Sequence, residues 1–167
     1  MKRVVLMLCL ALTLAGCGTT ATVQTPSGSV WQAKLLGGEG TSSGFSFNTE
    51  IAFGGTGALT FTDFQLLNSD TCFGSTTPPV VAGSLTGLTY NTDDQITAGI
   101  FTLTLTSSAG DVVTLTNQTI TGTVNPNTSP ATLSNGLITG LWTLVPGSGS
   151  SCPATVNNPF TLTQSTS

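Results

Sequence analysis

The sequence predicts an all-β domain built as an antiparallel meander of about eight strands, and three observations support that prediction. Apolar and polar residues alternate with a period of two in several segments, as in Phe45–Phe53 and Phe101–Thr106. After the N-terminus, no segment repeats apolar residues at i, i+3, i+4 and i+7 over a useful length, so we expect little helix. Only 6% of the residues are charged, and the polar positions are filled largely by serine, asparagine and threonine, whose β-branched side chain suits a sheet surface.

The strands can be placed in order from the alternation and from the turn residues between the alternating segments. Glycine, asparagine, aspartate and proline cluster in these intervals, where backbone freedom or local hydrogen bonds favour turns. The expected strands are Val30–Leu36, Phe45–Phe53, Leu59–Leu66, Ser84–Tyr90, Phe101–Thr106, Val112–Thr116, Thr119–Val124, Gly136–Leu144 and Phe160–Gln164.

In the expected strand Leu59–Leu66, the apolar residues change from odd to even positions part-way along. Leu59 and Phe61 share one face of an ideal strand, whereas Phe64 and Leu66 share the opposite face. One extra residue would return all four side chains to the same side, so the sequence predicts a β-bulge near Asp63.

The scarcity of charge on the expected strands favours closure of the sheet. Proteins usually protect open sheet edges with lysines, inward charges or prolines. Here Lys34, Glu50 and Asp63 are the main charged residues on strands. A barrel has no edges, so we expect a closed barrel in preference to a β-sandwich. Trp31 in the first expected strand resembles the early tryptophan of lipocalin- and avidin-like barrels, which implies an up-and-down barrel.

The N-terminus has the organisation of a bacterial lipoprotein signal. Two cations at positions 2 and 3 precede the apolar run Val4–Leu14, which is too short to span a bilayer as a mature helix. The run ends in Leu14-Ala15-Gly16-Cys17, which resembles the lipobox of bacterial lipoproteins. An ordinary secretory signal with an incidental cysteine is the alternative.

The lipobox resemblance implies a particular chemistry and location. Cleavage would precede Cys17, whose sulfur would carry diacylglycerol and whose amino group would carry an acyl chain such as palmitate. Gly18 stands where aspartate would signal inner-membrane retention, so the resemblance implies the outer membrane. The expected organisation is a signal helix over 1–16, a lipidated cysteine with a flexible tether over 17–29, and one β-domain over 30–167.

Cys72 and Cys152 are expected to form a disulfide bond. The other two cysteines belong to the signal and to the lipid anchor, and an oxidising envelope leaves this pair for each other. They lie in the two longest expected loops, Asn68–Ala82 and Pro146–Pro159. A redox or metal site is the alternative, but the chain contains no Cys-x-x-Cys motif and no histidine.

The charge balance restricts the partners. Removal of residues 1–16 leaves 167 − 16 = 151 residues with one cation, Lys34, and seven acids, a formal charge of 1 − 7 = −6. Nucleic acids are excluded because binding them requires several cations, and anionic lipid head groups are equally poor partners. The expected partners are the membrane, through the lipid on Cys17, and an envelope protein, a polysaccharide or a small apolar ligand.

The residue types argue against catalysis, and we expect no cofactor. Without histidine, Ser-His-Asp and Cys-His machinery and imidazole metal sites are excluded, and Lys34 is expected to be a surface residue. The carboxylates available for a glycosidase pair are Glu39, Glu50, Asp63, Asp93 and Asp94. Turn formation explains most of them, and Asn91 with Asp93 and Asp94 lacks the spacing of a calcium loop.

Large apolar side chains define the remaining candidate site. Trp31, Trp142 and Tyr90 could form a sugar-binding platform, although we expect both tryptophans in the core. The residues that would line a small lipophilic ligand in a hollow barrel are Trp31, Phe45, Phe47, Phe61, Phe101, Leu103 and Trp142. The same side chains could instead fill the interior.

Three functions follow from these observations. The first hypothesis is a non-catalytic domain, anchored in the envelope, with a structural or interaction role. The second is a carrier of a small lipophilic ligand, and the third is a carboxylate-based glycosidase.

Overall fold

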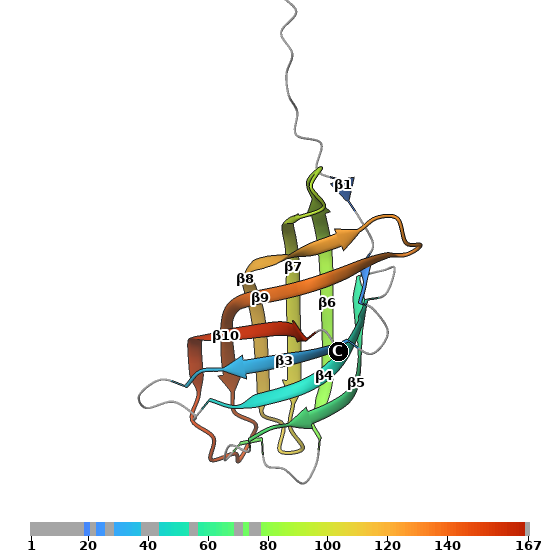
Figure 1. Ribbon diagram of the computed structural model, residues 1–167. Helices are drawn as coiled ribbons and strands as arrows, with labels where there is room; N and C mark the ends of the chain where they lie inside the picture. The colour runs from blue at the N-terminus through green and yellow to red at the C-terminus, as the bar shows by residue number, and fades with distance from the viewer. Residues whose placement is uncertain are drawn as a thin grey trace, which may run out of the picture.

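The computed structural model describes residues 19–20, 23–25, 29–37, 44–53, 57–68, 72–73 and 78–165. All regular structure within these residues is β-strand (Figure 1). The strands are β1 (Thr19–Thr20), β2 (Val23–Gln24), β3 (Val30–Leu35), β4 (Ser46–Phe53), β5 (Ala58–Leu66), β6 (Val80–Tyr90), β7 (Ile96–Thr106), β8 (Val112–Asn125), β9 (Ala131–Val145) and β10 (Thr155–Ser165). The expected signal helix over 1–16 and the lipidation residue Cys17 lie outside the described residues.

The eight strands from β3 to β10 form a closed antiparallel barrel, as the sequence predicts. Each strand pairs with the next one along the chain, and β10 pairs with β3 to complete the circle. The ladder between β5 and β6 is the shortest within the barrel, with two paired positions at Ala58↔Ser84 and Leu59↔Gly83. The up-and-down order means that every turn lies at one of two barrel ends.

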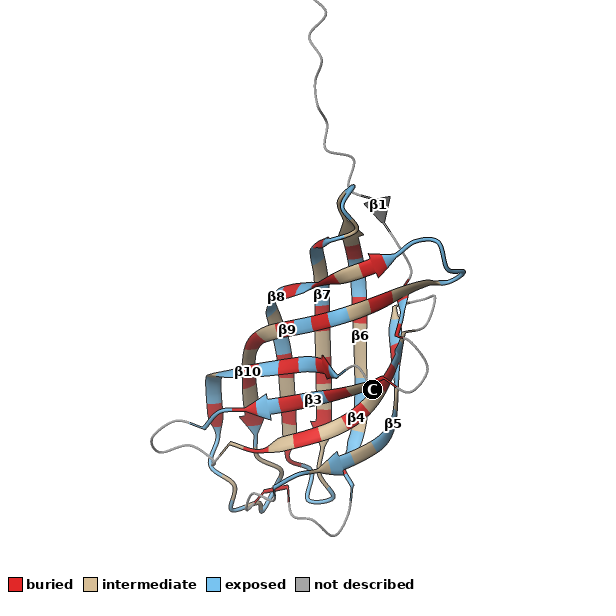
Figure 2. Cartoon of the chain, viewed as in Figure 1, coloured by how far each residue is buried: buried red, intermediate tan, exposed pale blue. Residues whose placement is uncertain are grey.

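Alternation along the strands separates the core from the surface, and Figure 2 shows it as red and paler bands along each strand. On β7, Phe101, Leu103 and Leu105 are fully buried, whereas Thr102 and Thr104 face outward. Their partners on β8 obey the same rule, since Leu115 is paired with Leu103 inside the barrel. The hydrophobic effect of burying these rows is the main force that fixes the register.

The predicted bulge in β5 is confirmed. Asn48 of β4 pairs with Gln65 and Glu50 pairs with Thr62, so two residues of β5 stand opposite one of β4. Asp63 takes up the extra length with a φ of 51°, in the left-handed region that aspartate tolerates better than most residues.

Two strands expected separately, Val112–Thr116 and Thr119–Val124, are one continuous strand, β8. The ladder with β9 shifts between Asn117 and Thr119, and opposite this shift stands Gly140, where a Cβ would lie 2.1 Å from the Thr116 carbonyl oxygen. The Asn117 side chain replaces the missing ladder to β7, because its amide accepts from Phe101 N and donates to Gly99 O, both at 2.9 Å. β8 therefore bends without ending, as Figure 1 shows where β8, β9 and β10 turn together.

The two cysteine loops are shorter than expected, because β6 begins at Val80 and β10 begins at Thr155. Pro159, expected to close a loop, lies within β10 opposite Leu141. Its carbonyl accepts from Leu36 N at 3.0 Å, just beyond the last β3 residue. In an antiparallel strand the nitrogen of a residue points to the same side as its carbonyl, so an N–H at position 159 would face the Leu36 carbonyl. That carbonyl accepts from Trp142 Nε1 at 3.0 Å instead, so the missing N–H of proline leaves it paired.

Residues 17–29 were expected to form a flexible tether, and that expectation is wrong for the part of the segment that forms short strands. Thr19 and Thr20 pair with Tyr90 and Thr89 of β6, and Val23 and Gln24 run parallel to the start of β9. We call residues 19–20 and 23–25 the N-terminal strap. Val23 is buried, and the Thr25 hydroxyl donates to the Ile51 carbonyl of β4, so burial and backbone pairing hold a segment whose composition resembles a linker.

The strap defines one end of the barrel, the strap end, which also carries the β6–β7 and β8–β9 turns. The opposite end carries the β5–β6, β7–β8 and β9–β10 connections, and we call it the disulfide end (Figure 1). Within the described part of the chain, no helix has the length and apolar character needed to cross a membrane.

Candidate functional sites at the two barrel ends

A disulfide bond joins Cys72 and Cys152 at the disulfide end, as predicted. It links the β5–β6 connection to the β9–β10 connection across 80 residues of sequence, with the two Cα atoms 5.6 Å apart. Phe73, the neighbour of Cys72, is buried and stacks on Phe45 with ring centroids 5.1 Å apart. The cross-link therefore holds an aromatic side chain across this end of the barrel.

Asp111 lies beside the disulfide and is almost fully buried. Its carboxylate accepts from the Ser107 hydroxyl and from Gly147 N, both at 2.9 Å, and so joins the β7–β8 turn to the β9–β10 connection. Its Oδ2 is also 3.6 Å from Cys152 Sγ, a contact only, because a disulfide sulfur carries no proton. Burial raises the pKa of Asp111, but hydrogen bonds from Ser150, Gly147 and Ser107 outweigh it and leave the pKa below its ordinary value.

Trp142 completes the filling of the disulfide end. Its ring meets the edge of Phe45 with centroids 6.1 Å apart, and its Nε1 donates to the Leu36 carbonyl at 3.0 Å. This tryptophan is fully buried with its one polar atom paired, which confirms the expectation that it belongs to the core.

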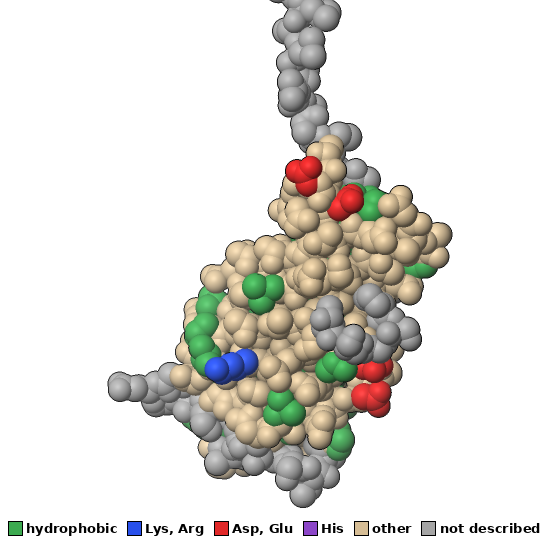
Figure 3. Space-filling model, viewed as in Figure 1, with side chains coloured by type: hydrophobic (Ala, Val, Ile, Leu, Met, Phe, Trp, Pro, Cys, Tyr) green, Lys and Arg blue, Asp and Glu red, His purple; other side chains and the backbone are tan. Residues whose placement is uncertain are grey.

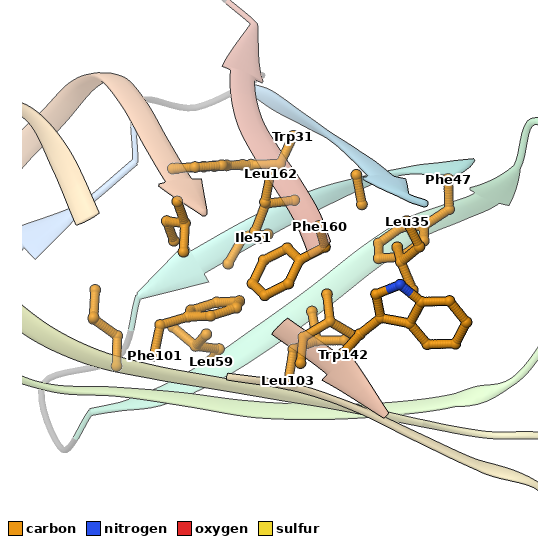
Figure 4. Close-up of a cluster of buried hydrophobic side chains, with 14 of the residues drawn as sticks. Trp31, Leu35, Phe47, Ile51, Leu59, Phe101, Leu103, Trp142, Phe160 and Leu162 are labelled. Carbon is orange, nitrogen blue, oxygen red and sulfur yellow. The ribbon is translucent and has the colours of Figure 1, made fainter. Parts of the chain in front are cut away.

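Trp31 is equally buried but lies toward the strap end, and Figure 4 shows the two tryptophans on opposite sides of the cluster with Phe160 and Ile51 between them. Its ring packs edge-on against Phe53 at 6.2 Å. On its other side, a Cβ at Gly136 would lie 2.3 Å from Trp31 Cη2, so β9 needs glycine there. Unlike Trp142, Trp31 has an Nε1 with no hydrogen-bond partner among the described residues.

Polar side chains gather around Trp31. Ser29 is buried, and its hydroxyl also lacks a partner within the described chain. Gln164 is buried and paired, since its Oε1 accepts from Gly136 N at 2.9 Å and its Nε2 donates to Leu133 O at 3.0 Å. The Thr49 hydroxyl donates to Thr62 O at 2.9 Å. The β3, β4 and β10 side of the strap end is therefore polar inside the barrel.

The opposite wall of the strap end is aliphatic. Leu85 and Leu88 of β6, Ile96 of β7 and Ile120 of β8 point inward, and each keeps 4–8% exposure. By contrast, Phe101, Leu103 and Leu105 further down β7 are at 0%. Glycine at position 99 allows Leu88 and Ile120 to pack closely over β7, because a Cβ there would lie 3.0 Å from Leu88 Cδ1 and 3.3 Å from Ile120 Cγ2.

The side chains expected to line a ligand are divided between these environments. Phe45, Phe47, Phe101, Leu103, Trp31 and Trp142 are fully buried, and Phe61 is half-buried. Phe61 lies across Gly83 of β6, whose Cβ would be 2.9 Å from the ring. Phe47 packs on Phe64 at 4.8 Å. All seven side chains belong to one continuous core. Of the two tryptophans in it, Trp31 is the one that faces the polar neighbours of the strap end.

The described carboxylates expected as alternatives for catalysis lie on the outside. Glu50 projects from β4 toward the Thr62 hydroxyl at 3.4 Å, and Asp63 is exposed at the bulge. Figure 3 shows acidic side chains gathered beside β4 and β5 and at the β6–β7 turn, on a face that is mostly neither charged nor hydrophobic. Glu39 lies outside the described residues, and Lys34 is exposed on β3.

The turn holding Asp93 and Asp94 is shaped by hydrogen bonds from backbone N–H groups to the Asn91 side chain. The Asn91 side-chain oxygen accepts from Asp93 N at 3.0 Å and from Gln95 N at 2.9 Å, which occupies the atom that a calcium ion would need. Among the described residues, no cluster of three or more histidine, cysteine, aspartate or glutamate side chains could hold a metal ion.

Sequence reasoning did not single out Asp111, Ser29 or Gln164. Asp111 stands in a Ser-Ala-Gly-Asp turn that resembles any surface turn, and its burial depends on a connection 36 residues away. The regular position of Gln164 in an alternating strand was the one available signal, since it places an amide on the inward face. No protein-family model, curated protein or solved structure matches the chain.

Proposed function

We propose that the protein is an envelope lipoprotein whose barrel is a non-catalytic interaction module, held at the outer membrane by lipid on Cys17. The lipobox at Leu14–Cys17 and the glycine at position 18 support the anchor and its location. The Cys72–Cys152 disulfide is consistent with an oxidising compartment.

The observation that carries this proposal is the pairing of the strap. Among the described residues, the first to pair through the backbone is Thr19, two positions after Cys17. Two Cα–Cα steps reach about 7.6 Å at most, so lipid on Cys17 would bring the strap end close to the bilayer. The disulfide end would then face away from the membrane, where an envelope protein or polysaccharide could reach it.

Charge supports an anchor that depends on acyl chains. Asp93 and Asp94 lie in the β6–β7 turn at the strap end and would be repelled by anionic head groups. Lys34 is the one cation within the described residues. Hydrocarbon insertion by more than one chain is the interaction that can hold such a protein stably.

The anchor is tested by growing cells with a labelled fatty acid. The wild-type protein should carry the label and sediment with membranes, and Cys17→Ser should lose both properties. Unchanged labelling and fractionation of Cys17→Ser would contradict the proposal.

The orientation is tested with a fluorophore on a single added cysteine. Asp93→Cys reports from the strap end and the matched Ser108→Cys, in the exposed β7–β8 turn, from the disulfide end, each in protein reconstituted into vesicles containing spin-labelled lipid. We expect strong quenching at position 93 and little at position 108. Equal quenching at both positions would mean that the strap does not orient the barrel.

A ligand carrier is the second candidate, and the buried unpaired Trp31 Nε1 and Ser29 hydroxyl favour it. Buried polar atoms are usually hydrogen-bonded, so the unpaired atoms of Ser29, just before β3, and of Trp31, within β3, suit a bound partner. Native mass spectrometry of protein purified from its own host tests this function. A copurifying small molecule is expected, and a mass equal to that of the lipidated chain alone would count against it.

A further inference from the structure

We propose that the strap end of the barrel interior binds an uncharged molecule with a carbonyl or hydroxyl head on a hydrocarbon body. This inference rests on the carrier function and adds the place, the contacts and the chemical class of the ligand. Its three supports are the unpaired polar atoms on one wall, the aliphatic character of the opposite wall and the charge of the surroundings.

Trp31 and Ser29 supply the polar contacts. Both residues are more than nine-tenths buried; Trp31 lies on the inward face of β3, and Ser29 directly precedes the first residue of that strand. Indole Nε1 is a donor only, so its partner must be an acceptor, whereas the Ser29 hydroxyl can donate or accept. A hydroxyl or carbonyl oxygen is the smallest group that satisfies Trp31, and a hydroxyl also offers a proton to Ser29.

The neighbouring polar side chains leave few groups free to recognise a ligand, because they already make hydrogen bonds within the protein. Gln164 is paired at both ends of its amide with Gly136 and Leu133, and Thr49 donates to Thr62. The Thr25 hydroxyl of the strap donates to Ile51 O. Among the described polar side chains of this wall, Trp31 and Ser29 are therefore the two that remain to recognise a ligand.

The charge of the surroundings excludes an ionised head group. Lys34 is the one cation in the described residues; it lies three positions after Trp31 on β3 and faces outward, next to the inward-facing Ala33. An anion buried beside Trp31 would lose its hydration without gaining a positive partner, which is strongly unfavourable. The site therefore selects a neutral head group over a carboxylate of equal chain length.

The hydrocarbon body has one suitable direction. Below Trp31 the interior is filled by fully buried side chains such as Phe160, Phe101 and Leu103. Toward β6–β8, Leu88 and Ile120 keep slight exposure and present only aliphatic carbon. A short alkyl chain would extend along this wall, beneath the strap.

The strap gives a route of entry. Its described residues, 19–20 and 23–25, are held by two paired positions on β6, two on β9 and the Thr25 hydrogen bond, whereas β8 and β9 pair along most of their length. Segments with few backbone bonds open locally at much lower free energy than the whole fold. The strap can therefore separate from β9 while the eight-stranded barrel stays closed.

The test uses the full chain carrying Cys17→Ser, which removes the lipid and leaves every described residue in place. Calorimetric titrations with 1-octanol and with octanoate at neutral pH compare a neutral and an anionic head on the same hydrocarbon. We expect saturable binding of one octanol and an affinity for octanoate at least about tenfold weaker.

Matched tryptophan variants locate the site. Trp31→Phe keeps an aromatic ring but removes the unpaired N–H, and should weaken octanol binding about threefold to tenfold, the effect of one neutral hydrogen bond. Trp142→Phe makes the same change where the N–H is already paired with Leu36 O, so it should leave octanol affinity unchanged. Ser29→Ala, with a smaller loss expected, is the second variant if Trp31→Phe does not fold.

Each outcome decides a different point. Octanol affinity that is unaffected by both Trp31→Phe and Ser29→Ala would overturn this site and leave the carrier function standing. Octanoate binding as tight as octanol would overturn the neutral ligand class. No saturable binding of octanol by the wild-type interior would overturn the site, and an empty mass spectrum of the host-purified protein would independently reject the carrier function.

Discussion

At the residue scale, the two barrel ends differ in how their buried polar atoms are satisfied. Asp111 at the disulfide end receives hydrogen bonds from Ser107 and Gly147, whereas the Trp31 N–H toward the strap end donates to no acceptor among the described residues. A paired buried group stabilises the fold, and an unpaired one carries its desolvation cost into the folded state. The unpaired Trp31 N–H is therefore a local cost at the strap end, whereas the paired Asp111 stabilises the disulfide end.

Asp111→Asn should destabilise the protein at neutral pH by about 1–3 kcal/mol, because a neutral amide accepts more weakly and brings an N–H₂ group into a site built for an acceptor. The folded-state pKa of Asp111 lies below its ordinary value of 3.8. Its contribution is therefore fully present above the unfolded pKa and is lost as the pH falls through the lowered folded pKa.

Denaturant melts at pH 7 and near pH 3 measure this effect, and the gap between wild type and Asp111→Asn should narrow at the lower pH. Asp93→Asn, in an exposed turn, is the control and should change stability by less than about 0.5 kcal/mol. A gap that stays constant with pH would show that the charge of Asp111 contributes nothing.

The two tryptophans offer a second residue-scale prediction, in the absence of ligand. Trp31→Phe and Trp142→Phe remove similar volume from fully buried positions, but only Trp142 loses a hydrogen bond, the one to Leu36 O. Trp142→Phe should therefore be more destabilising by about 1 kcal/mol. Chemical denaturation of both variants provides the comparison, and equal midpoints would contradict it.

At the scale of the elements, the sequence predicted what depends on alternation and missed what depends on contacts between distant strands. The strands from β3 to β10 and the bulge at Asp63 could be found, because each follows from the side on which neighbouring side chains are buried. The continuity of β8 could not, since it depends on Asn117 and Gly140 bridging to other strands. The strap was missed because Val23 is its one strongly apolar residue among the described positions.

The sequence could predict which residues belong to the candidate site, but not which of them contact one another. The burial of both tryptophans was predictable from strand alternation and from the apolar nature of their neighbours. Trp142 is paired because Leu36, just after the end of β3, places its carbonyl within reach of the Trp142 N–H on β9, whereas Trp31 has no such acceptor among the described residues. The sequence alone does not show this difference. Asp111 was missed for a related reason, because its partner Gly147 lies in another connection.

The packing of β3 against β9 can be tested through Gly136. A Cβ there would lie 2.3 Å from Trp31 Cη2, on a rigid ring, and 3.1 Å from Gln164 Oε1, so Gly136→Ala should cost about 1–3 kcal/mol. Phenylalanine lacks the indole atom that would clash. Trp31→Phe should therefore recover much of the loss, and a double-mutant cycle should give a coupling of at least about 1 kcal/mol. Additive effects would place the Trp31 ring elsewhere.

At the scale of the whole molecule, the disulfide and the barrel reinforce each other. The ladder between β5 and β6 is the shortest in the barrel, with two paired positions, and Cys72 lies in the connection between those two strands. The bond to Cys152 attaches this connection to the β9–β10 side, beside the buried Asp111. The cross-link thus supports the barrel where backbone pairing is least extensive.

Removal of the disulfide by Cys72→Ser with Cys152→Ser should therefore lower the free energy of unfolding by several kcal/mol. The chain-entropy model gives about 4–5 kcal/mol for a closed loop of this length, and the loss of Phe73 packing on Phe45 adds to it. The variant should also aggregate when made in a reducing cytoplasm, because the unfolded chain has few charges to prevent edge-to-edge strand pairing. Denaturant melts of oxidised wild type, reduced wild type and the double variant measure the effect. Coincident midpoints for all three would show that the eight-stranded barrel holds its β5–β6 seam without the bond.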